Sequence, residues 1–307
     1  MSDGEDLAEP FLAAIIVTYN PDRKELIELL DAVVSQVRLV LVVDNGSKDD
    51  VSCVIADSGT PNSHCYCLGS NLGVAEAINY GIDKANTFGT THVVLFDQDS
   101  LPAADMVERL FDNYRNMLEQ GIKVAAVGPR YTDPRSGNPP PFIRLEGLRL
   151  VRADCAGSAP VPVDYLVSSG CLIGVQSINE IGLMQTSLFI DYVDVEWGLR
   201  AGSKGYQSFG ICDAYMQHKL GENPFTLFGR NIPLHSPLRH YYHFRNAVWL
   251  YRQSWVPLAW KIVDGYRLVL KYVVYSLFTD QKLAHWRMMT RGLWHGLTGK
   301  MGANTTY

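Results

Sequence analysis

Two carboxylates stand one residue apart at the end of an apolar stretch. Asp97 and Asp99 follow residues 92–96, whose apolar, β-branched and aromatic side chains predict a buried central strand. Open α/β sheets bind ligands beyond the carboxyl ends of their strands. Two hard anionic oxygens at that edge suit a divalent cation, Mg²⁺ or Mn²⁺, that also contacts a phosphate. The alternative is structural, with the aspartates forming a turn and a helix N-cap before Pro102.

Strand and helix patterns alternate through the first 130 residues. Apolar strands are predicted at 13–18, 39–43, 64–68, 93–96 and 124–127. Helices are predicted to begin at Asp22, at Ser47 and Lys48, after Gly73 and at Ala103. Strand–helix–strand connections are right-handed, so the sequence predicts an α/β, Rossmann-like fold with a mostly parallel sheet and helices on both faces.

Polar or glycine-containing segments follow four successive strands. They are residues 18–20, 44–47, 71–73 and 97–99, and all are expected on one rim of the sheet, as in a nucleotide crevice. The chain lacks the G-x-G-x-x-G fingerprint after its first strand and the G-x-x-x-x-G-K-[ST] loop anywhere. A nucleotide bound here is therefore expected to have its phosphates held by a metal.

Composition places the chain among globular proteins. Its 307 residues are 47% hydrophobic and 19% charged, enough for one large α/β domain with an appendage or for two domains. The net charge of −5 is uneven, because residues 235–307 carry ten Lys or Arg against two Asp. A basic, aromatic tail on an acidic body indicates which partners the surface can bind and does not indicate the fold. Nucleic acid is a poor candidate, since no recognition motif is present.

Cysteine usage and hydropathy indicate the cellular compartment of the protein and its relation to the membrane. Six scattered cysteines favour a reducing, cytosolic protein, with Cys65 and Cys67 on one side of a strand as buried thiols rather than a zinc pair. Residues 1–10 are acidic and polar, unlike a signal peptide. The most apolar stretch, 255–278, is interrupted by charges and is not expected to span a membrane. Residues 134–141, rich in proline, are predicted to form an exposed loop.

Five motifs in order resemble those of the family 2 glycosyltransferases. They are IVTYNP at 16–21, VDNGS at 43–47, NLGVAEAIN at 71–79, DQD at 97–99 and FIDYVDVEWGLR at 189–200. The resemblance covers roughly residues 12–250 and implies a glycosyltransferase A-type fold. The bacterial L-rhamnosyltransferases are the most similar branch, because they often carry a Tyr-Tyr and Arg-Asn pattern such as YYHFRN at 241–246.

The resemblance assigns donor and metal roles to residues on the rim. The donor-binding set is Thr18, Tyr19, Asn20, Asp44, Asn71, Gly73, Asp97, Gln98 and Arg245. Thr18 and Tyr19 would border the base, and Asp44 would accept a hydrogen bond from the pyrimidine ring. The metal set is Asp97, Asp99 and His218. The alternatives are ordinary loop chemistry for Asn71 and Gly73, and a structural histidine at 218.

The acidic segment 189–200 holds the acceptor-side candidates. An inverting transfer needs a carboxylate to take the proton of the attacking hydroxyl. By the resemblance Asp194 is that catalytic base, with Asp191, Glu196 and Trp197 on the acceptor side. Asp191 and Glu196 are the runners-up for the base and are better suited to orienting the acceptor. A structural alternative is that Asp194 only caps a helix and favours its dipole.

The C-terminal region is predicted to be a separate helical extension. A catalytic domain is expected at 1–234, followed by helices at 239–253, 258–278 and 281–297. Five of the six tryptophans lie in this region, interleaved with Lys and Arg. Such a composition favours contact with an anionic membrane surface. Packing on the catalytic domain or on a second subunit, as in a homo-oligomer, is the alternative.

The expected function combines these features. The chain is expected to be a metal-dependent inverting glycosyltransferase that moves L-rhamnose from dTDP-L-rhamnose to a hydroxyl of a bacterial surface glycan, such as lipopolysaccharide or a lipid-linked saccharide. It would act in the bacterial cytoplasm, on the inner face of the cytoplasmic membrane. One alternative is a UDP-hexose donor with the same mechanism. Another is a non-catalytic nucleotide-sugar-binding subunit that serves assembly.

Overall fold

A computed structural model describes residues 9–132, 142–153, 155, 157, 159–218, 225–227, 230–232 and 234–304. The loop predicted at 134–141 lies outside these residues. The strands of the main sheet are β1 (Leu12–Thr18), β2 (Leu39–Asp44), β3 (Ser63–Cys67), β4 (His92–Asp97), β5 (Ser100–Pro102), β6 (Val124–Thr132), β9 (Val161–Val163), β10 (Leu172–Gly174) and β11 (Gln207–His218). Two hairpins pair β7 (Phe142–Glu146) with β8 (Arg149–Ala153), and β12 (Phe225–Leu227) with β13 (Arg230–Ile232).

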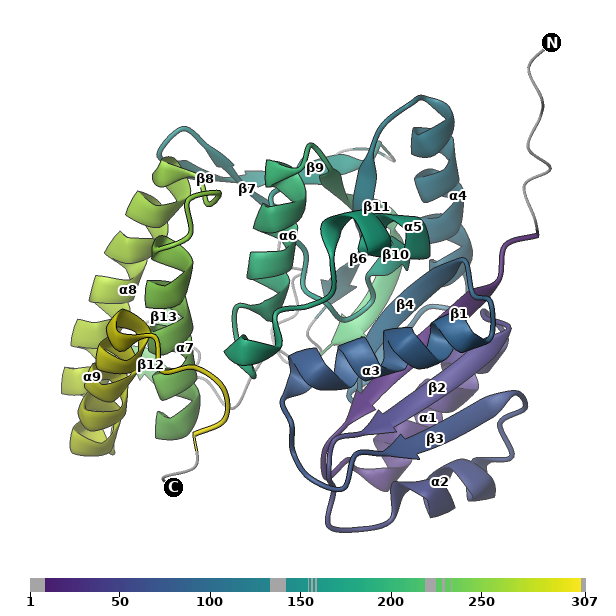
Figure 1. The fold of residues 1–307 in the computed structure, drawn as a ribbon, viewed down its shortest axis with the longest axis horizontal. Helices are drawn as coiled ribbons and strands as arrows, with labels where there is room; N and C mark the ends of the chain where they lie inside the picture. The colour runs from purple at the N-terminus through teal and green to yellow at the C-terminus, as the bar shows by residue number, and fades with distance from the viewer. Residues whose placement is uncertain are drawn as a thin grey trace.

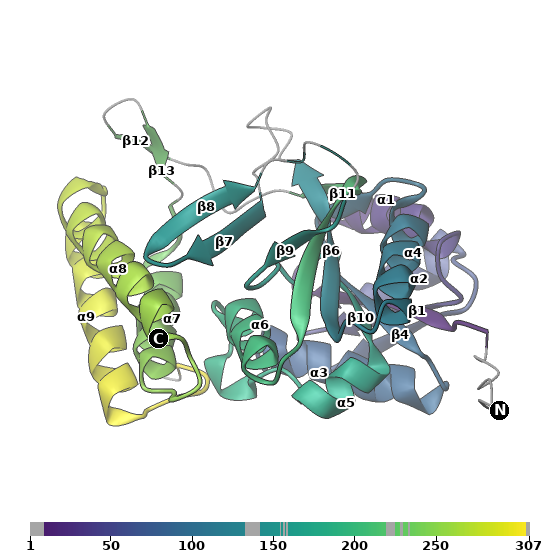
Figure 2. The same cartoon turned by 90° about the horizontal axis from the view of Figure 1, so that it is seen from above.

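Nine helices are seen in the described residues, together with the short 3₁₀ turn at Thr186–Leu188. They are α1 (Arg23–Val34), α2 (Val51–Ser58), α3 (Val74–Thr87), α4 (Met106–Glu119), α5 (Val175–Ile181), α6 (Val193–Ser203), α7 (Pro237–Tyr251), α8 (Leu258–Phe278) and α9 (Lys282–Thr298). Figures 1 and 2 show α7, α8 and α9 together at one end of the molecule, beyond the sheet.

The main sheet is mixed, with a parallel half that carries the predicted rim. Its strand order is β3-β2-β1-β4-β10-β6-β11-β5, and β9 pairs with β11. Strands β3, β2, β1 and β4 are parallel neighbours, and β6 is parallel to β11. The short strands β5, β9 and β10 are antiparallel to their neighbours. The mostly parallel α/β sheet predicted from the sequence is confirmed.

Helices cover both faces of the sheet because the buried strands alternate their side chains. In β1, Ala14 and Ile16 pack with α1, α2 and α4, whereas Ala13 and Ile15 pack with α3, α5 and α6. Every residue of β2 is buried, as a central parallel strand requires. A hydrophobic core therefore lies on each face of the sheet, and the two cores fix the edge at which its parallel strands end. Figure 1 shows the helices that cover the sheet.

Two element boundaries differ from the predictions. A side chain binds the backbone at the first, and strand pairing replaces a helix start at the second. The helix predicted from Ser47 begins only at Val51, with Asp50 as its N-cap. Ser47 instead donates its N–H to Asp44, 3.0 Å away. The alternative of a helix N-cap directly before Pro102 is also wrong. Residues 100–102 form β5, which pairs with β11, and α4 starts at Met106.

The cysteines depart from the prediction. Cys65 is half-buried and Cys67 is exposed, because β3 is the edge strand of the sheet. The prediction of two buried thiols is therefore wrong for Cys67. Cys155 and Cys212 form a disulfide across 57 residues. This bonded pair weakens the cysteine-based inference of a reducing compartment.

The C-terminal helices pack into a bundle through α7. Gly292 and Gly296 allow α9 to approach α7 closely, because a Cβ at either position would lie within 2.6 Å of a backbone oxygen of α7. A shared hydrophobic cluster contains Phe244 of α7, Leu268 of α8 and Met289 of α9. In both ribbon views α7 lies between the domain that holds the main sheet and the outer pair α8 and α9 (Figures 1 and 2). The three predicted helices are confirmed.

Candidate donor and metal site

The predicted rim exists, and hydrogen bonds join its loops. Tyr19, half-exposed after β1, donates its N–H to Oε1 of Gln98 at 2.7 Å, and Nε2 of Gln98 donates to the Tyr19 carbonyl at 3.3 Å. Asn20 adopts a positive φ of 48° and donates its N–H to Ser47. Side-chain amides thus hold the segments after β1, β2 and β4 in one fixed arrangement.

Asp44 lies at the floor of the rim and is held by its neighbours. Its carboxylate accepts hydrogen bonds from the hydroxyl of Thr18 at 3.1 Å and from Ser47. Thr18 has no exposed surface, so the prediction that it borders the base is wrong. Thr18 instead orients Asp44, which is 4% exposed. Hydrogen bonding between Asp44 and a base stays a prediction.

The loop before α3 is shaped by close backbone approach. Asn71 accepts hydrogen bonds at its Oδ1 from Asn45 and from the N–H of Gly73. Gly73 has φ +92°, and a Cβ there would lie 2.6 Å from the carbonyl oxygen of Phe189. That carbonyl accepts the N–H of Val74 at 2.8 Å. Gly73 therefore lets the acceptor-side segment close over the start of α3, while a donor contact by Asn71 or Gly73 stays a prediction.

Asp97, Asp99 and His218 converge, as the resemblance implied. Each offers one ligand atom, and these atoms lie within 4.8 Å of one another. Nε2 of His218 is 3.8 Å from Asp97, and its Nδ1 is 3.5 Å from Asp99. The two carboxylates are partly exposed and the imidazole is buried, so the cluster opens to solvent on its acidic side. Two oxygens and one nitrogen fit the coordination of Mg²⁺ or Mn²⁺.

Strand pairing positions His218 beside the aspartates. β5 and the end of β11 are antiparallel, with Ser100 opposite His218. The hydroxyl of Ser100 contacts Nδ1 of His218 at 3.1 Å and the hydroxyl of Ser169 at 2.6 Å. Ser169 also accepts the backbone N–H of Asp97 at 3.0 Å. Sequence reasoning missed both serines, because nothing local shows that two serines 69 residues apart would meet.

Asp194 lies in the first turn of α6, and its surroundings raise its pKa into the range useful to a general base. Burial raises the pKa of Asp194 to about 6, the N–H of Val195 opposes that shift, and the carboxylate of Asp191 adds to it. The charge of Asp97 also raises this pKa. A carboxylate with a pKa near neutrality can both accept a proton and release it again.

Asp191 is held by a residue from the C-terminal helices. Nε of Arg239, in the first turn of α7, lies 3.2 Å from the Asp191 carboxylate. Burial raises the pKa of Asp191 and the Arg239 charge lowers it. Burial raises the pKa of Asp97, and the charges of His218 and Arg239 act against that rise. The helical region therefore contributes a charge to the candidate site.

Two of the predicted acceptor-side residues are structural. Glu196 is 2% exposed and binds Arg200 through both carboxylate oxygens, at 2.7 and 2.9 Å. Trp197 is 4% exposed and donates its ring N–H to the carbonyl of Gly182 at 2.8 Å. Neither side chain presents a free polar group, so both support α6 from within, and their place on the acceptor side stays a prediction.

The structure also corrects the prediction that Arg245 binds the donor. Its side chain is fully buried, and its N–H groups bind the carbonyls of Ser187, Leu188 and Gly302. It cannot reach a donor diphosphate. The neighbouring Asn246 donates to the carbonyls of Leu188, Ile190 and Asp191. The Arg-Asn pair is thus a scaffold for the segment before α6.

That segment has an unfavourable backbone conformation. Phe189, Asp191 and Tyr192 all have φ between 62° and 68°, a region costly for residues with side chains. The carbonyls bound by Asn246 lie within it. We infer that the hydrogen bonds from α7 hold this strained segment, and with it Asp191 and Asp194, in place.

Replacing Asn246 tests this support. Asn246→Ala removes the Asn246 donor from the carbonyls of Ile190 and Asp191, and one of the donors from the carbonyl of Leu188, which Arg245 still binds. We therefore expect the free energy of unfolding to fall by about 2–4 kcal/mol. Turnover should fall as well, because Asp194 follows the released segment. Urea unfolding and activity measure the two effects. The matched control is Gln253→Ala just after α7, since the amide of Gln253 donates to the carbonyl of Trp249 and not to the segment before α6. Equal losses at both positions would contradict the scaffold role.

Comparison with known proteins defines the class. Residues 13–153 match the family model for glycosyl transferase family 2. The chain is 35% identical over 266 residues to the dTDP-rhamnosyl transferase RfbF of Shigella flexneri, covering 86% of this chain and 85% of that protein. The chain therefore belongs to glycosyltransferase family 2 and is a glycosyltransferase.

Solved structures support the fold assignment. GalNAc-T7, in complex with UDP, GalNAc and Mn²⁺, superposes over 96% of this chain with a TM-score of 0.62 and 12% identity. TarS from S. aureus superposes over 94% with a TM-score of 0.61 and 17% identity. The chain spans 57% and 49% of those two proteins. At such identities the likeness shows the glycosyltransferase A-type fold alone.

Proposed function

We propose that this glycosyltransferase transfers L-rhamnose from dTDP-L-rhamnose to a hydroxyl group, with inversion and with a divalent cation. The observation that carries the mechanism is the convergence of Asp97, Asp99 and His218, together with the buried carboxylate of Asp194, whose pKa is raised to about 6. The similarity to RfbF supports the choice of donor. The catalytic unit is residues 1–234, and residues 235–307 form its helical extension.

Asp97, Asp99 and His218 would hold the cation, which is Mg²⁺ or Mn²⁺. A bound cation supplies Lewis-acid stabilisation of the charge that develops on the leaving diphosphate. Tyr19, Asn20 and Gln98 present fixed polar groups on the rim beside this cluster. Together with Asp44, Asn71 and Gly73, they are the proposed nucleoside side of the donor site.

Asp194 is the proposed catalytic base. Its carboxylate would take the proton of the acceptor hydroxyl as that oxygen bonds to the anomeric carbon and the bond to the diphosphate breaks. Attack occurs from the face opposite the leaving group, so a β-linked donor gives an α-rhamnoside. Asp191, held by Arg239, would orient the acceptor. Burial that keeps the pKa of Asp194 near 6 makes its proton affinity suitable at neutral pH.

The proposed acceptor is a growing bacterial surface glycan, either lipopolysaccharide or a lipid-linked saccharide. The proposed location is the bacterial cytoplasm, at the inner face of the cytoplasmic membrane. Within the described residues no helix is long and apolar enough to cross a bilayer. The same site with a UDP-hexose donor is the second candidate, since TarS has been solved with UDP-GlcNAc on this fold.

A panel of donors tests the proposal. We expect dTDP-L-rhamnose with Mn²⁺ or Mg²⁺ to raise the melting temperature more than dTDP-glucose, UDP-galactose, UDP-glucose or GDP-mannose at equal concentration. Saturating ligand stabilises the folded state by a few kcal/mol, about 2.7 at a hundredfold excess over Kd. A preference for a UDP-sugar would change the donor and keep the mechanism. Stabilisation by nucleotide sugars without any turnover would favour a non-catalytic assembly subunit.

A further inference from the structure

The outer helices α8 and α9 expose an unusual amount of apolar surface. The exposed residues on α8 are Leu258, Ile262, Tyr266, Val269, Leu270, Val273, Leu277 and Phe278. Those on α9 are Leu283, Trp286, Trp294 and Leu297. Most follow one another at spacings of three or four, so each helix carries a continuous apolar stripe. Tyr266 is 66% exposed and Trp294 is 64% exposed, so most of the surface of each of these side chains is open to solvent.

The two stripes face the same way. On α8, Trp260, Leu268 and Tyr275 are buried in the cluster shared with α7. On α9, Gly292 and Gly296 lie against α7. The exposed residues occupy the opposite side of each helix and so point away from α7 and the catalytic domain. Figures 1 and 2 agree, since α8 and α9 form the outermost layer at that end.

Not all the aromatic residues of this region belong to the stripes. Trp260 is 5% exposed, and Trp249 packs against the core clusters. The alternative of internal packing is thus correct for these two tryptophans. Trp286 and Trp294 remain exposed at 46% and 64%. Internal packing therefore leaves the outer surface unexplained.

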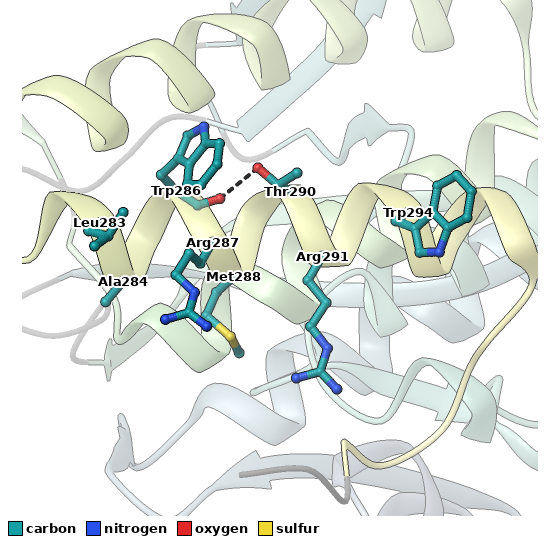
Figure 3. A pocket seen from close by; sticks show the side chains of 8 residues that line it. All are labelled: Leu283, Ala284, Trp286, Arg287, Met288, Thr290, Arg291 and Trp294. Atoms are coloured by element: carbon teal, nitrogen blue, oxygen red, sulfur yellow. Dashed lines mark hydrogen bonds between the residues drawn. The ribbon is translucent and has the colours of Figure 1, made fainter.

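Cations accompany the apolar stripes. Lys282, Arg287 and Lys300 are exposed on or just after α9, whereas Asp280 is the exposed acid among residues 258–304. Figure 3 shows a groove along α9 with Trp286 and Trp294 projecting from one side and Arg287 and Arg291 from the other. Apolar, aromatic and basic groups of α9 thus line the same groove.

We propose that this outer face of α8 and α9 lies on an anionic phospholipid bilayer. The apolar stripes would enter the boundary between head groups and acyl chains, tryptophan and tyrosine would lie at the head groups, and the cations would contact lipid phosphates. The purpose of this membrane contact rests on the proposed function, because the contact would keep the catalytic site beside a membrane-borne acceptor.

Charge favours lipid over a second copy of the chain. In a symmetric dimer built on this face, Lys282 and Arg287 would meet a second copy on which Asp280 is the exposed acid among several cations. Like charges brought together in this way oppose association. An anionic bilayer instead complements every exposed cation of the face. A dimer is therefore an outcome that the experiment must detect, rather than the proposed occupant.

The test is co-sedimentation of the full chain with phosphatidylcholine vesicles, with and without phosphatidylglycerol, in the absence of any nucleotide sugar. We expect binding only to the anionic vesicles and a decrease at high salt. Arg287→Glu combined with Lys282→Glu should weaken binding at least about 25-fold, since each basic residue near the surface contributes about fivefold. Val269→Ser combined with Trp294→Ser should weaken it at least about tenfold.

Matched variants elsewhere keep the test specific. Lys24→Glu on α1 and Leu118→Ser on α4 change exposed residues of the same kinds and should leave vesicle binding unchanged. Equal binding to neutral vesicles, or no binding at all, would overturn the proposal. So would a dimer in light scattering that the α8 and α9 variants dissociate. Donor-induced stabilisation, measured without vesicles, reports separately on the proposed function.

Discussion

Asp194→Asn should abolish most turnover while leaving donor binding intact. The amide fills the same space but cannot accept the proton of the acceptor hydroxyl, so we expect kcat to fall by a factor on the order of 10² or more. Donor affinity should change little, because Asp97, Asp99 and His218 are untouched. Kinetics and a calorimetric titration with the donor measure the two effects. Full activity would exclude Asp194 as the base.

The same residue makes a pH prediction of definite sign. A base with a pKa of about 6 is protonated below that value, so kcat/KM of the wild type should fall as pH decreases through about 6. The raised pKa also means that ionised Asp194 costs folding free energy above pH 6, while below the unfolded pKa near 4 that cost is absent. Asp194→Asn should therefore be more stable than the wild type at pH 8, by up to about 3 kcal/mol, and not at pH 4.

Glu196→Gln is the matched control two residues further along α6. Its buried carboxylate pairs with Arg200, so removing the charge should cost about 2–4 kcal/mol of stability. Chemistry should survive, because Glu196 contacts no solvent-facing part of the site. The two variants are thus expected to show opposite patterns of activity and stability. The same pattern in both would mean that α6 simply tolerates no change.

Asp99→Ala should remove cation-dependent donor binding. Asp99 supplies one of the three clustered ligand atoms, and His218 alone with Asp97 leaves a poor site for Mg²⁺ or Mn²⁺. We expect donor affinity in the presence of Mn²⁺ to fall at least about tenfold, as losses of metal ligands and their supports do. Titration calorimetry with and without Mn²⁺ is the measurement.

The control for Asp99 is a neighbouring acid outside the cluster. Glu28 on α1 lines the same surface depression as Asp99 and His218. Glu28→Ala should keep the Mn²⁺-dependent affinity. Retention of that affinity in Asp99→Ala, or equal losses in both variants, would show that the cluster does not hold the cation.

Sequence patterns predicted the architecture well because local rules govern it. Uncharged β-branched strands, helix caps such as Asp22 and polar segments after each strand are properties of short stretches. The parallel order of β3, β2, β1 and β4 then places those segments on one edge. The convergence of Asp97, Asp99 and His218 followed from the family resemblance, since 119 residues separate His218 from Asp99.

Side-chain roles were harder to predict, because burial and partners come from distant segments. Thr18 lies in a rim motif but is enclosed by its neighbours, and Glu196 lies in an acidic motif but is neutralised by Arg200. Arg245 looks like a phosphate ligand in sequence, yet its partners are carbonyls near 187 and 302. Only the packing of α7 against the segment before α6 shows that the motif is a scaffold.

The most direct test is release of dTDP from dTDP-L-rhamnose when bacterial membranes supply the acceptor. It is measured with Mn²⁺ and with a chelator, for the wild type and Asp194→Asn. We predict release that requires both the cation and the Asp194 carboxylate, with α-linked rhamnose appearing in the membrane fraction. Release that persists with the chelator, or that Asp194→Asn performs as fast as the wild type, would contradict a metal-dependent inverting transfer at this site.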